Sequence, residues 1–85
     1  MENLRLSSHA KKVIFEGNIK LTWIENTFNN PDKIEIDLYD NTLEHRLKII
    51  NQYDNRILRI IYNKTVNPVL VITAFFDRRM KGKLL

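Results

Sequence analysis

The chain has 85 residues, of which 44% are hydrophobic and 28% are charged, and its formal net charge is +4. These values predict one globular domain, residues 1–85, and exclude a disordered chain. The absence of cysteine excludes disulfides and thiolate metal sites. The longest apolar run, residues 69–76, is far shorter than the ~20 residues of a membrane helix, and no N-terminal segment is typical of a signal peptide. We therefore expect a cytoplasmic protein that makes no membrane contact.

The basic charge is concentrated in the second half of the chain. Residues 1–44 contain 5 basic and 8 acidic side chains, whereas residues 45–85 contain 9 basic and 2 acidic side chains. A basic segment of this kind is typical of proteins that bind a polyanion or an acidic partner. The alternative is an ordinary solvated surface, and the charge pattern leaves both open.

Two short helices are predicted near the N-terminus, after a first strand at residues 4–7. Ser8 is predicted to cap the first helix, and Gly17 to end it. The second helix is expected from residue 20 or 21 to residue 29, because Pro31 disfavours a helical conformation in the residue before it.

Further strands are predicted at residues 33–39, 43–50, 56–62 and 69–76. The first of these alternates apolar with charged residues, which is typical of a half-exposed or edge strand, and the last two are dense in β-branched and aromatic residues, which is typical of central strands. Asp54 and Asn55 are predicted to form a two-residue hairpin turn. The order β-α-α-β-β-β-β predicts an α+β fold in which both helices cover one face of a mostly antiparallel sheet. The opposite face is then left partly open for a site.

Two polar residues interrupt the central strands. Arg59 lies inside the strand at residues 56–62, and Thr73 lies inside the last strand. A buried guanidinium is costly unless an anion or a hydrogen-bond acceptor meets it, and its planar shape suits a phosphate group. We interpret Arg59 as a ligand of RNA phosphate; the alternative is a structural pair with an acid such as Asp54 or Asp77.

The chain has two histidines, which are the side chains best suited to proton transfer near neutral pH. His9 stands at the start of the first predicted helix, beside two lysines, where a neutral imidazole is able to act as a base on a ribose 2′-hydroxyl. A structural role for His9 remains the alternative. His45 is in phase with Leu43 and Leu47, and we interpret it as a packing residue at a strand end.

The sequence predicts neither a metal site nor a cofactor site. Glu35 and Asp37 share one face of a strand, but no histidine stands at ligand spacing from them. The chain has only 2 glycines, so a glycine-rich phosphate loop is excluded.

Short motifs in this chain resemble those of a family of small bacterial domains related to the RelE/ParE and BrnT toxins of toxin–antitoxin systems. That family has a His-Ala box that opens the first helix, a Gly-x-Ile step, a helix that closes in Asn-Pro, an Arg-Val-Val-Tyr-like strand, and a Val-Val-Thr strand with a basic end. The corresponding segments here are SHAKK at residues 8–12, GNI at 17–19, NNPD at 29–32, RIIY at 59–62, VIT at 71–73, and RR at 78–79.

The resemblance implies a RelE-like fold with its site on the sheet face opposite the helices. His9, Arg59 and Thr73 would converge there as catalytic residues, and Lys12 with Arg78 or Arg79 would support phosphate binding. The full set of candidate RNA-binding residues is Lys11, Lys12, Tyr62, Phe75, Arg78, Arg79 and Lys81. For the aromatic residues of this set, core packing is the alternative.

The leading hypothesis is a metal-independent endoribonuclease that acts on mRNA as the toxin of a type II toxin–antitoxin system. Its expected partners are RNA and a cognate acidic antitoxin, with which it would form a hetero-oligomer. One alternative is a non-catalytic module of the same fold that binds RNA or protein. Another is a ParE-like toxin directed at a protein target, since a fold alone does not establish an activity.

Overall fold

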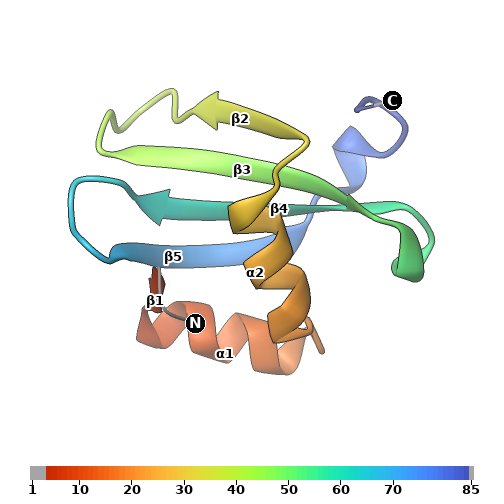
Figure 1. Cartoon of the computed structure of the whole chain (residues 1–85), viewed down its shortest axis with the longest axis horizontal. Helices are drawn as coiled ribbons and strands as arrows, with labels where there is room; N and C mark the ends of the chain where they lie inside the picture. Colours follow the sequence, from red (N-terminus) through yellow and green to blue (C-terminus); the bar gives the residue numbers. More distant parts are fainter. Residues whose placement is uncertain (1–3, 85) are drawn as a thin grey trace.

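The computed structural model describes residues 4–84, which form two helices and a five-stranded sheet. In chain order the elements are β1 (Leu4–Leu6), α1 (Ser8–Glu16), α2 (Leu21–Asn29), β2 (Lys33–Ile36), β3 (Leu43–Ile50), η1 (Asn51–Tyr53), β4 (Arg56–Asn63), β5 (Val69–Phe76) and η2 (Arg78–Met80), of which η1 and η2 are single 3₁₀ turns (Figure 1). The predicted α+β class is confirmed. Neither α1 nor α2, with nine residues each, is long enough to span a membrane.

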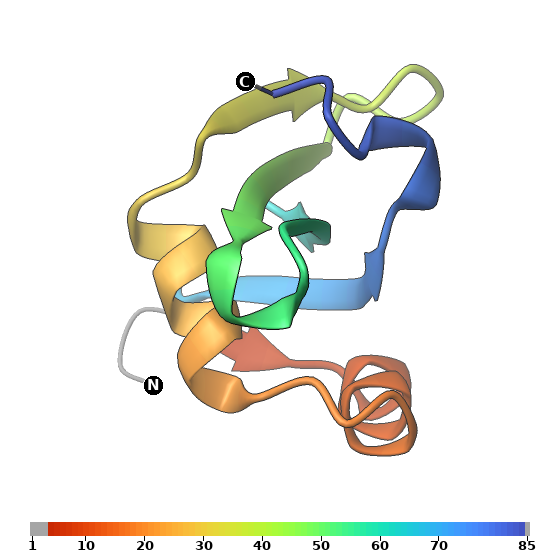
Figure 2. The ribbon, with the colours of Figure 1, turned by 90° about the vertical axis from the view of Figure 1, so that its right-hand side faces the viewer.

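The sheet has the strand order β1-β5-β4-β3-β2, so β4 lies at its centre and β2 at one edge. The short β1 pairs with β5 in parallel, and the other neighbours are antiparallel. Seen end-on, the sheet is strongly curved (Figure 2). We call the face opposite the helices the inner face, and β2 and the C-terminal segment lie on either side of it.

Both helices pack against the same face of the sheet. Ala10 and Ile14 of α1 and Ile24 of α2 form one buried cluster with side chains of β4 and β5. The residues that β4 and β5 contribute to this cluster are Leu58, Ile60, Tyr62, Val71 and Ala74. Because side chains alternate along a strand, the intervening residues of β4, including Arg59, lie on the opposite face.

The register also places Thr73 and Phe75 on the face opposite the helices. Arg59 pairs with Phe75, and Ile61 pairs with Thr73, before a bulge between Ile61 and Tyr62 shifts the register. Directly opposed residues in a sheet share a face. Arg59 and Thr73 therefore lie on the face that the helices leave uncovered.

Two local predictions are corrected. The N-cap of α1 is Ser7 rather than Ser8, because the Ser7 hydroxyl accepts a hydrogen bond from the Ala10 N–H and also donates one to the Ile72 carbonyl. The connection between β3 and β4 is longer than the predicted two-residue turn, since η1 precedes Asp54 and Asn55. Both of those residues have positive φ, at 56° and 54°, as residues in a tight reversal often do.

The edge strand β2 has an unusual orientation. Its apolar side faces solvent, with Ile34 49% and Ile36 69% exposed, and Leu38 just beyond the strand is 88% exposed. Glu35 and Asp37 instead turn toward the inner face of the sheet, where they meet polar partners from β3 and β4. An edge strand is confirmed here, although it ends at Ile36 rather than at residue 39. Glu35 and, just beyond the strand, Asp37 supply carboxylates to the sheet face opposite the helices.

Candidate functional site

A cavity of about 460 Å³ lies on the sheet face opposite the helices. Its wall combines side chains from β2, β3, β4, β5 and the C-terminal 3₁₀ turn. The polar members are Glu35, Asp37, His45, Arg59 and Arg79, and Tyr39 and Phe75 are its aromatic members.

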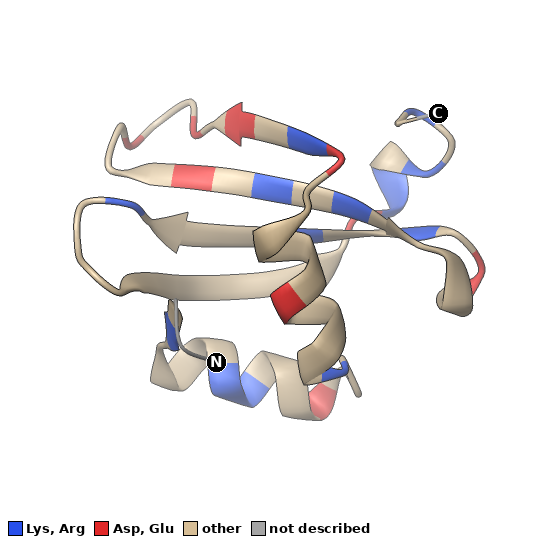
Figure 3. Cartoon of the chain, viewed as in Figure 1, with Lys and Arg blue, Asp and Glu red and all other residues tan. Residues whose placement is uncertain are grey.

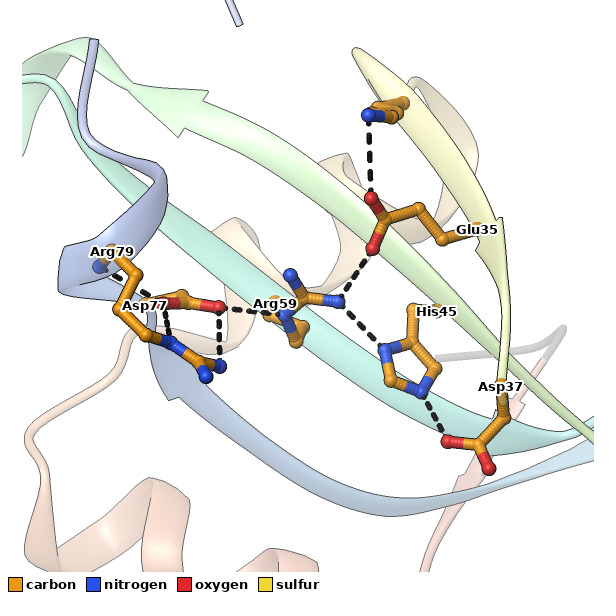
Figure 4. Close-up of polar contacts among 7 residues, drawn as sticks. Glu35, Asp37, His45, Arg59, Asp77 and Arg79 are labelled. Carbon is orange, nitrogen blue, oxygen red and sulfur yellow. Dashed lines mark hydrogen bonds and ion pairs between the residues drawn. The ribbon is translucent and has the colours of Figure 1, made fainter. Parts of the chain in front are cut away.

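Arg59 is the central residue of this cavity and is only 8% exposed. Its Nε donates to Oδ2 of Asp77 at 3.0 Å, and its Nη1 donates to Oε1 of Glu35 at 2.8 Å and to Nδ1 of His45 at 2.7 Å (Figure 4). The interpretation in which Arg59 pairs with Asp77 is thus confirmed. Among the described residues no acceptor binds Nη2, which leaves one edge of the guanidinium available to another acceptor.

His45 bridges Arg59 and Asp37. Its Nδ1 accepts from Arg59, so the arrangement fits a neutral imidazole whose proton is on Nε2 and is donated to Oδ1 of Asp37 at 2.7 Å. The prediction that His45 is a packing residue is wrong, because the Glu35–His45 pairing of β2 and β3 brings the imidazole among charged side chains.

The hydrogen bonds of this network keep three carboxyl groups ionised. The hydrogen bond from Arg59 lowers the pKa of Glu35, and the hydrogen bond from His45 lowers the pKa of Asp37. Burial by itself raises the pKa of Asp77, but hydrogen bonds from Arg79 and Arg59 outweigh it and leave that pKa below its ordinary value. Negative charge therefore surrounds Arg59 at neutral pH, and Arg79 and Lys33 partly balance it.

Not all of the predicted catalytic residues meet at this cavity. Arg59 lies at its centre. Thr73 shares the sheet face but neither lines the cavity nor bonds to Arg59 in the part of the chain described. His9 is exposed on α1, which packs with the helical layer, and is not among the residues that line the cavity. The predicted convergence of His9, Arg59 and Thr73 is therefore corrected.

The predicted RNA-binding residues divide in a similar way. Phe75 and Arg79 line the cavity, Arg78 and Lys81 line a neighbouring one, and Lys11 and Lys12 are exposed on α1. The prediction that Tyr62 is available to stack on a base is wrong. Its side chain is 1% exposed and faces the helices, where its ring packs edge-on against Phe28 at 5.3 Å. Its hydroxyl accepts from Arg46 and donates to Glu44.

Residues 6–76 match the sequence profile of the family described as "Domain of unknown function (DUF4258)". The chain belongs to this family. No curated protein and no solved structure shows significant similarity to the chain. The region matched to DUF4258 runs from the last residue of β1 to the last residue of β5, so it contains Glu35, His45 and Arg59, and Asp77 follows it directly.

Four residues of the site in this DUF4258 domain were not predicted as site residues: Glu35, Asp37, His45 and Asp77. A signal for three of them exists in the sequence. The segments at 33–39 and 43–50 flank a turn, and an antiparallel pairing centred on residue 40 places residue 35 opposite residue 45, as observed. For Asp77 the sequence predicts only a structural pair with Arg59, which is the contact that the structure shows.

Proposed function

We propose that this DUF4258 protein is a metal-independent endoribonuclease whose active site is the cavity around Arg59. One observation carries the proposal: the cavity places an imidazole, held by a carboxylate, in hydrogen-bond contact with a buried guanidinium. A second guanidinium, from Arg79, and an exposed aromatic ring, from Phe75, line the same cavity. A base, phosphate ligands and a stacking surface are the groups that cleavage of single-stranded RNA requires.

The proposed reaction is attack of a ribose 2′-oxygen on the adjacent phosphorus. A bond forms between O2′ and phosphorus, and the bond between phosphorus and the 5′-oxygen of the next nucleotide breaks. His45 takes the proton from the 2′-hydroxyl at Nδ1, while Asp37 holds the opposite ring nitrogen and stabilises the imidazolium. The imidazolium then returns the proton to the leaving 5′-oxygen. The products are a 2′,3′-cyclic phosphate and a free 5′-hydroxyl.

In this mechanism Arg59 and Arg79 bind the phosphate and stabilise the charge that develops on it. Arg59 presents its unpartnered Nη2 to a phosphate oxygen. The hydrogen bond from Arg59 Nη1 to the imidazole must also break, so that Nδ1 of His45 can accept the proton. An anionic phosphate oxygen is a stronger acceptor for Nη1 than the imidazole is. Glu35 and Asp77 act as positioning residues, because they hold the guanidinium at the centre of the sheet. The side chain of Arg79 is 82% exposed and bonds to Asp77, so a phosphate is able to reach its guanidinium from solvent.

The biological role that we propose is that of a toxin in a type II toxin–antitoxin system, acting on mRNA in the cytoplasm. This part rests on the resemblance of the motifs to the RelE/ParE and BrnT superfamily, and it includes a RelE-like topology and an acidic antitoxin as partner. The basic C-terminal half is suited to bind either RNA or an acidic antitoxin. Expression of the protein with and without its genomic neighbour, with growth and RNA integrity followed together, tests this role.

The activity is tested with purified protein and a single-stranded RNA in the presence of EDTA. We expect cleavage with 2′,3′-cyclic phosphate ends, and no cleavage of a DNA of the same sequence, which lacks the attacking hydroxyl. His45→Asn should lower the rate by about 10²- to 10⁴-fold, the usual contribution of general acid–base catalysis.

The matched control is His9→Asn, because His9 is exposed on α1 and should not affect the rate. Circular dichroism of each variant establishes that it is folded. Full activity of folded His45→Asn protein, or a rate in His9→Asn that falls as far as in His45→Asn, would show that the assigned site is wrong.

A second candidate function is an RNA-binding module without catalysis. It is favoured by the closed network around Arg59, in which Nε and Nη1 already have protein acceptors. This function predicts salt-dependent RNA binding without product formation under any of the conditions above.

A further inference from the structure

A second cavity, of about 210 Å³, lies at the end of the sheet where β4 begins and β5 ends. It is lined by Arg56 and Ile57 at the start of β4, by Phe76 and Asp77 at the end of β5, and by Arg78 and Lys81 of the C-terminal segment. Figure 3 shows basic residues at the start of β4 and on the C-terminal segment. The cavity at the centre of the sheet and this one are neighbours, since Asp77 lines the second and binds Arg59 of the first.

The charge of the second cavity is positive. Its one carboxylate, Asp77, is already bonded to Arg59 and Arg79, which do not line this cavity. The three cations that do line it lack strong partners. Arg78 has no acceptor among the described residues. Lys81 pairs only with the 75% exposed carboxylate of Asp54, and such surface pairs are weak.

Arg56 is positioned rather than neutralised. Its Nη1 donates to the Tyr53 hydroxyl at 3.2 Å, and its guanidinium lies 4.5 Å from the centroid of that ring. These contacts fix the direction of the side chain without removing its charge, and they leave Nε and Nη2 without a protein acceptor among residues 4–84. An oriented guanidinium with free donors is a typical phosphate ligand.

The floor of the cavity is apolar and partly aromatic. Ile57 is 1% exposed, and Phe76 packs against Tyr53 with ring centroids 4.9 Å apart. A third cavity, of about 190 Å³, adjoins this floor and shares Ile57 and Lys81 with it. Cations at the rim and an apolar, partly aromatic floor together match a nucleotide, which has both a phosphate and an aromatic base.

We propose that the second cavity is a nucleotide subsite. Arg56, Arg78 and Lys81 bind a phosphate, and the attached base lies over Ile57 and Phe76. In the ribonuclease proposed above, on which this inference rests, the occupant is a nucleotide of the same RNA strand that passes through the Arg59 cavity. An acidic peptide would satisfy the three cations but would leave the apolar floor without a matching group.

The test uses the full chain carrying His45→Asn, so that RNA binding is measured without cleavage. A fluorescent single-stranded RNA is titrated at several salt concentrations. The double variant Arg78→Gln, Lys81→Gln should weaken binding about 10-fold or more near physiological salt, and the salt slope should fall by about 0.7 for every phosphate ligand that is removed. Both residues are exposed in the structure, so the fold should persist.

The matched control is Lys64→Gln, which removes an exposed cation just beyond the opposite end of β4. It should leave binding and the salt slope nearly unchanged. A loss in Lys64→Gln equal, for each charge removed, to the loss in the double variant would show general charge attraction rather than a subsite, and would overturn the proposal.

Three competitors identify the occupant of the cavity. An unlabelled RNA should compete far better than a nucleoside 5′-monophosphate, and a poly-glutamate peptide should compete poorly. If the monophosphate binds as tightly as RNA, the cavity is a site for a free nucleotide; if the peptide does so, it is a site for acidic protein. Either result overturns the RNA subsite.

The proposed ribonuclease can fail separately. If the double variant weakens RNA binding while the native chain cleaves no RNA, the subsite stands and catalysis is wrong. If the native chain cleaves RNA, and Arg78→Gln, Lys81→Gln placed in the native background (with His45 intact) binds and cleaves as the native chain does, catalysis stands and the subsite is wrong.

Discussion

The two faces of β4 are stabilised by different kinds of interaction. On the helical face, Leu58, Ile60 and Tyr62 are at most 1% exposed and belong to one buried cluster with residues from both helices. On the opposite face, Arg59 is held by a few directional bonds to Asp77, Glu35 and His45. Burial of apolar groups is non-directional and nearly independent of pH, whereas a buried ion network depends on every partner.

The difference indicates where a site can be built in so small a domain. The helical face contributes stability through many small non-directional contacts, so it supports the fold. The opposite face concentrates charge at one point, and a ligand that offers a better acceptor can rearrange it. Stability and recognition are thus assigned to opposite sides of one strand.

The largest expected effect comes from removing the main anchor of Arg59. Asp77→Ala leaves a buried guanidinium without its Nε acceptor, and we expect it to destabilise the fold by about 3–5 kcal/mol. Urea denaturation measures the change. A loss below about 1 kcal/mol would show that the charged face does not depend on the network.

Arg79→Gln is the matched control, because Arg79 bonds to the same carboxylate but its side chain is 82% exposed. We expect it to change the free energy of unfolding by less than about 1 kcal/mol. The double variant Arg59→Met, Asp77→Leu should be more stable than Asp77→Ala, because it removes both charges together.

The next effect is a loss of stability in acid. The pKa values of Asp77 and Glu35 lie below their ordinary values of 3.8 and 4.5 in the folded chain. The unfolded chain therefore takes up protons first as the pH falls, so the contribution is complete above about pH 5 and is lost as the pH drops through the folded pKa values. Thermal unfolding between pH 7 and pH 2.5 should show this decline.

Glu35→Gln should make the acid limb shallower, because one depressed carboxyl group has been removed. An identical acid limb in Glu35→Gln would show that the decline originates elsewhere in the molecule. A change confined to the helical face should instead shift the whole curve without altering its slope.

Much of the fold could be predicted because its signals are local. The alternation of residues 33–39, the apolar runs at 56–62 and 69–76, and Pro31 after α2 each depend on neighbouring residues only. The cap of α1 could not be predicted correctly, since Ser7 and Ser8 are chemically identical and a contact with Ile72, 65 residues away, distinguishes them. The outward orientation of the apolar side of β2 is likewise a tertiary effect.

The site was harder to predict than the fold. Arg59 stood out because charge is rare inside an apolar strand, and Asp77 was already considered as its partner. Glu35 and His45 looked ordinary, because their roles depend on the register between β2 and β3 and on which side of β2 turns inward. Glu35 and His45 line one cavity together with Arg79 because the sheet curves and brings β2 toward the C-terminal segment (Figure 2).

A smaller effect tests the helical face alone. Ile60→Val removes one methylene group from a fully buried side chain, and we expect a loss of about 0.5–1.5 kcal/mol. The loss should be the same at pH 7 and pH 4, since no titratable group is involved. Denaturation at both pH values checks this, and a loss that doubles in acid would contradict the separation of the two faces.

The smallest expected effect concerns the one polar defect found on the helical face among the described residues. Thr27 of α2 is fully buried, and its Oγ1 has no hydrogen-bond partner in the part of the chain that the structure describes. An unsatisfied buried hydroxyl is unfavourable, so Thr27→Val should stabilise the fold by up to about 1 kcal/mol, as urea denaturation would measure. The matched control, Thr27→Ser, keeps the hydroxyl and loses the methyl group, and should be destabilising. If Thr27→Val is less stable than the native chain, the hydroxyl has an acceptor after all, and the assignment of Thr27 as an unsatisfied group is wrong.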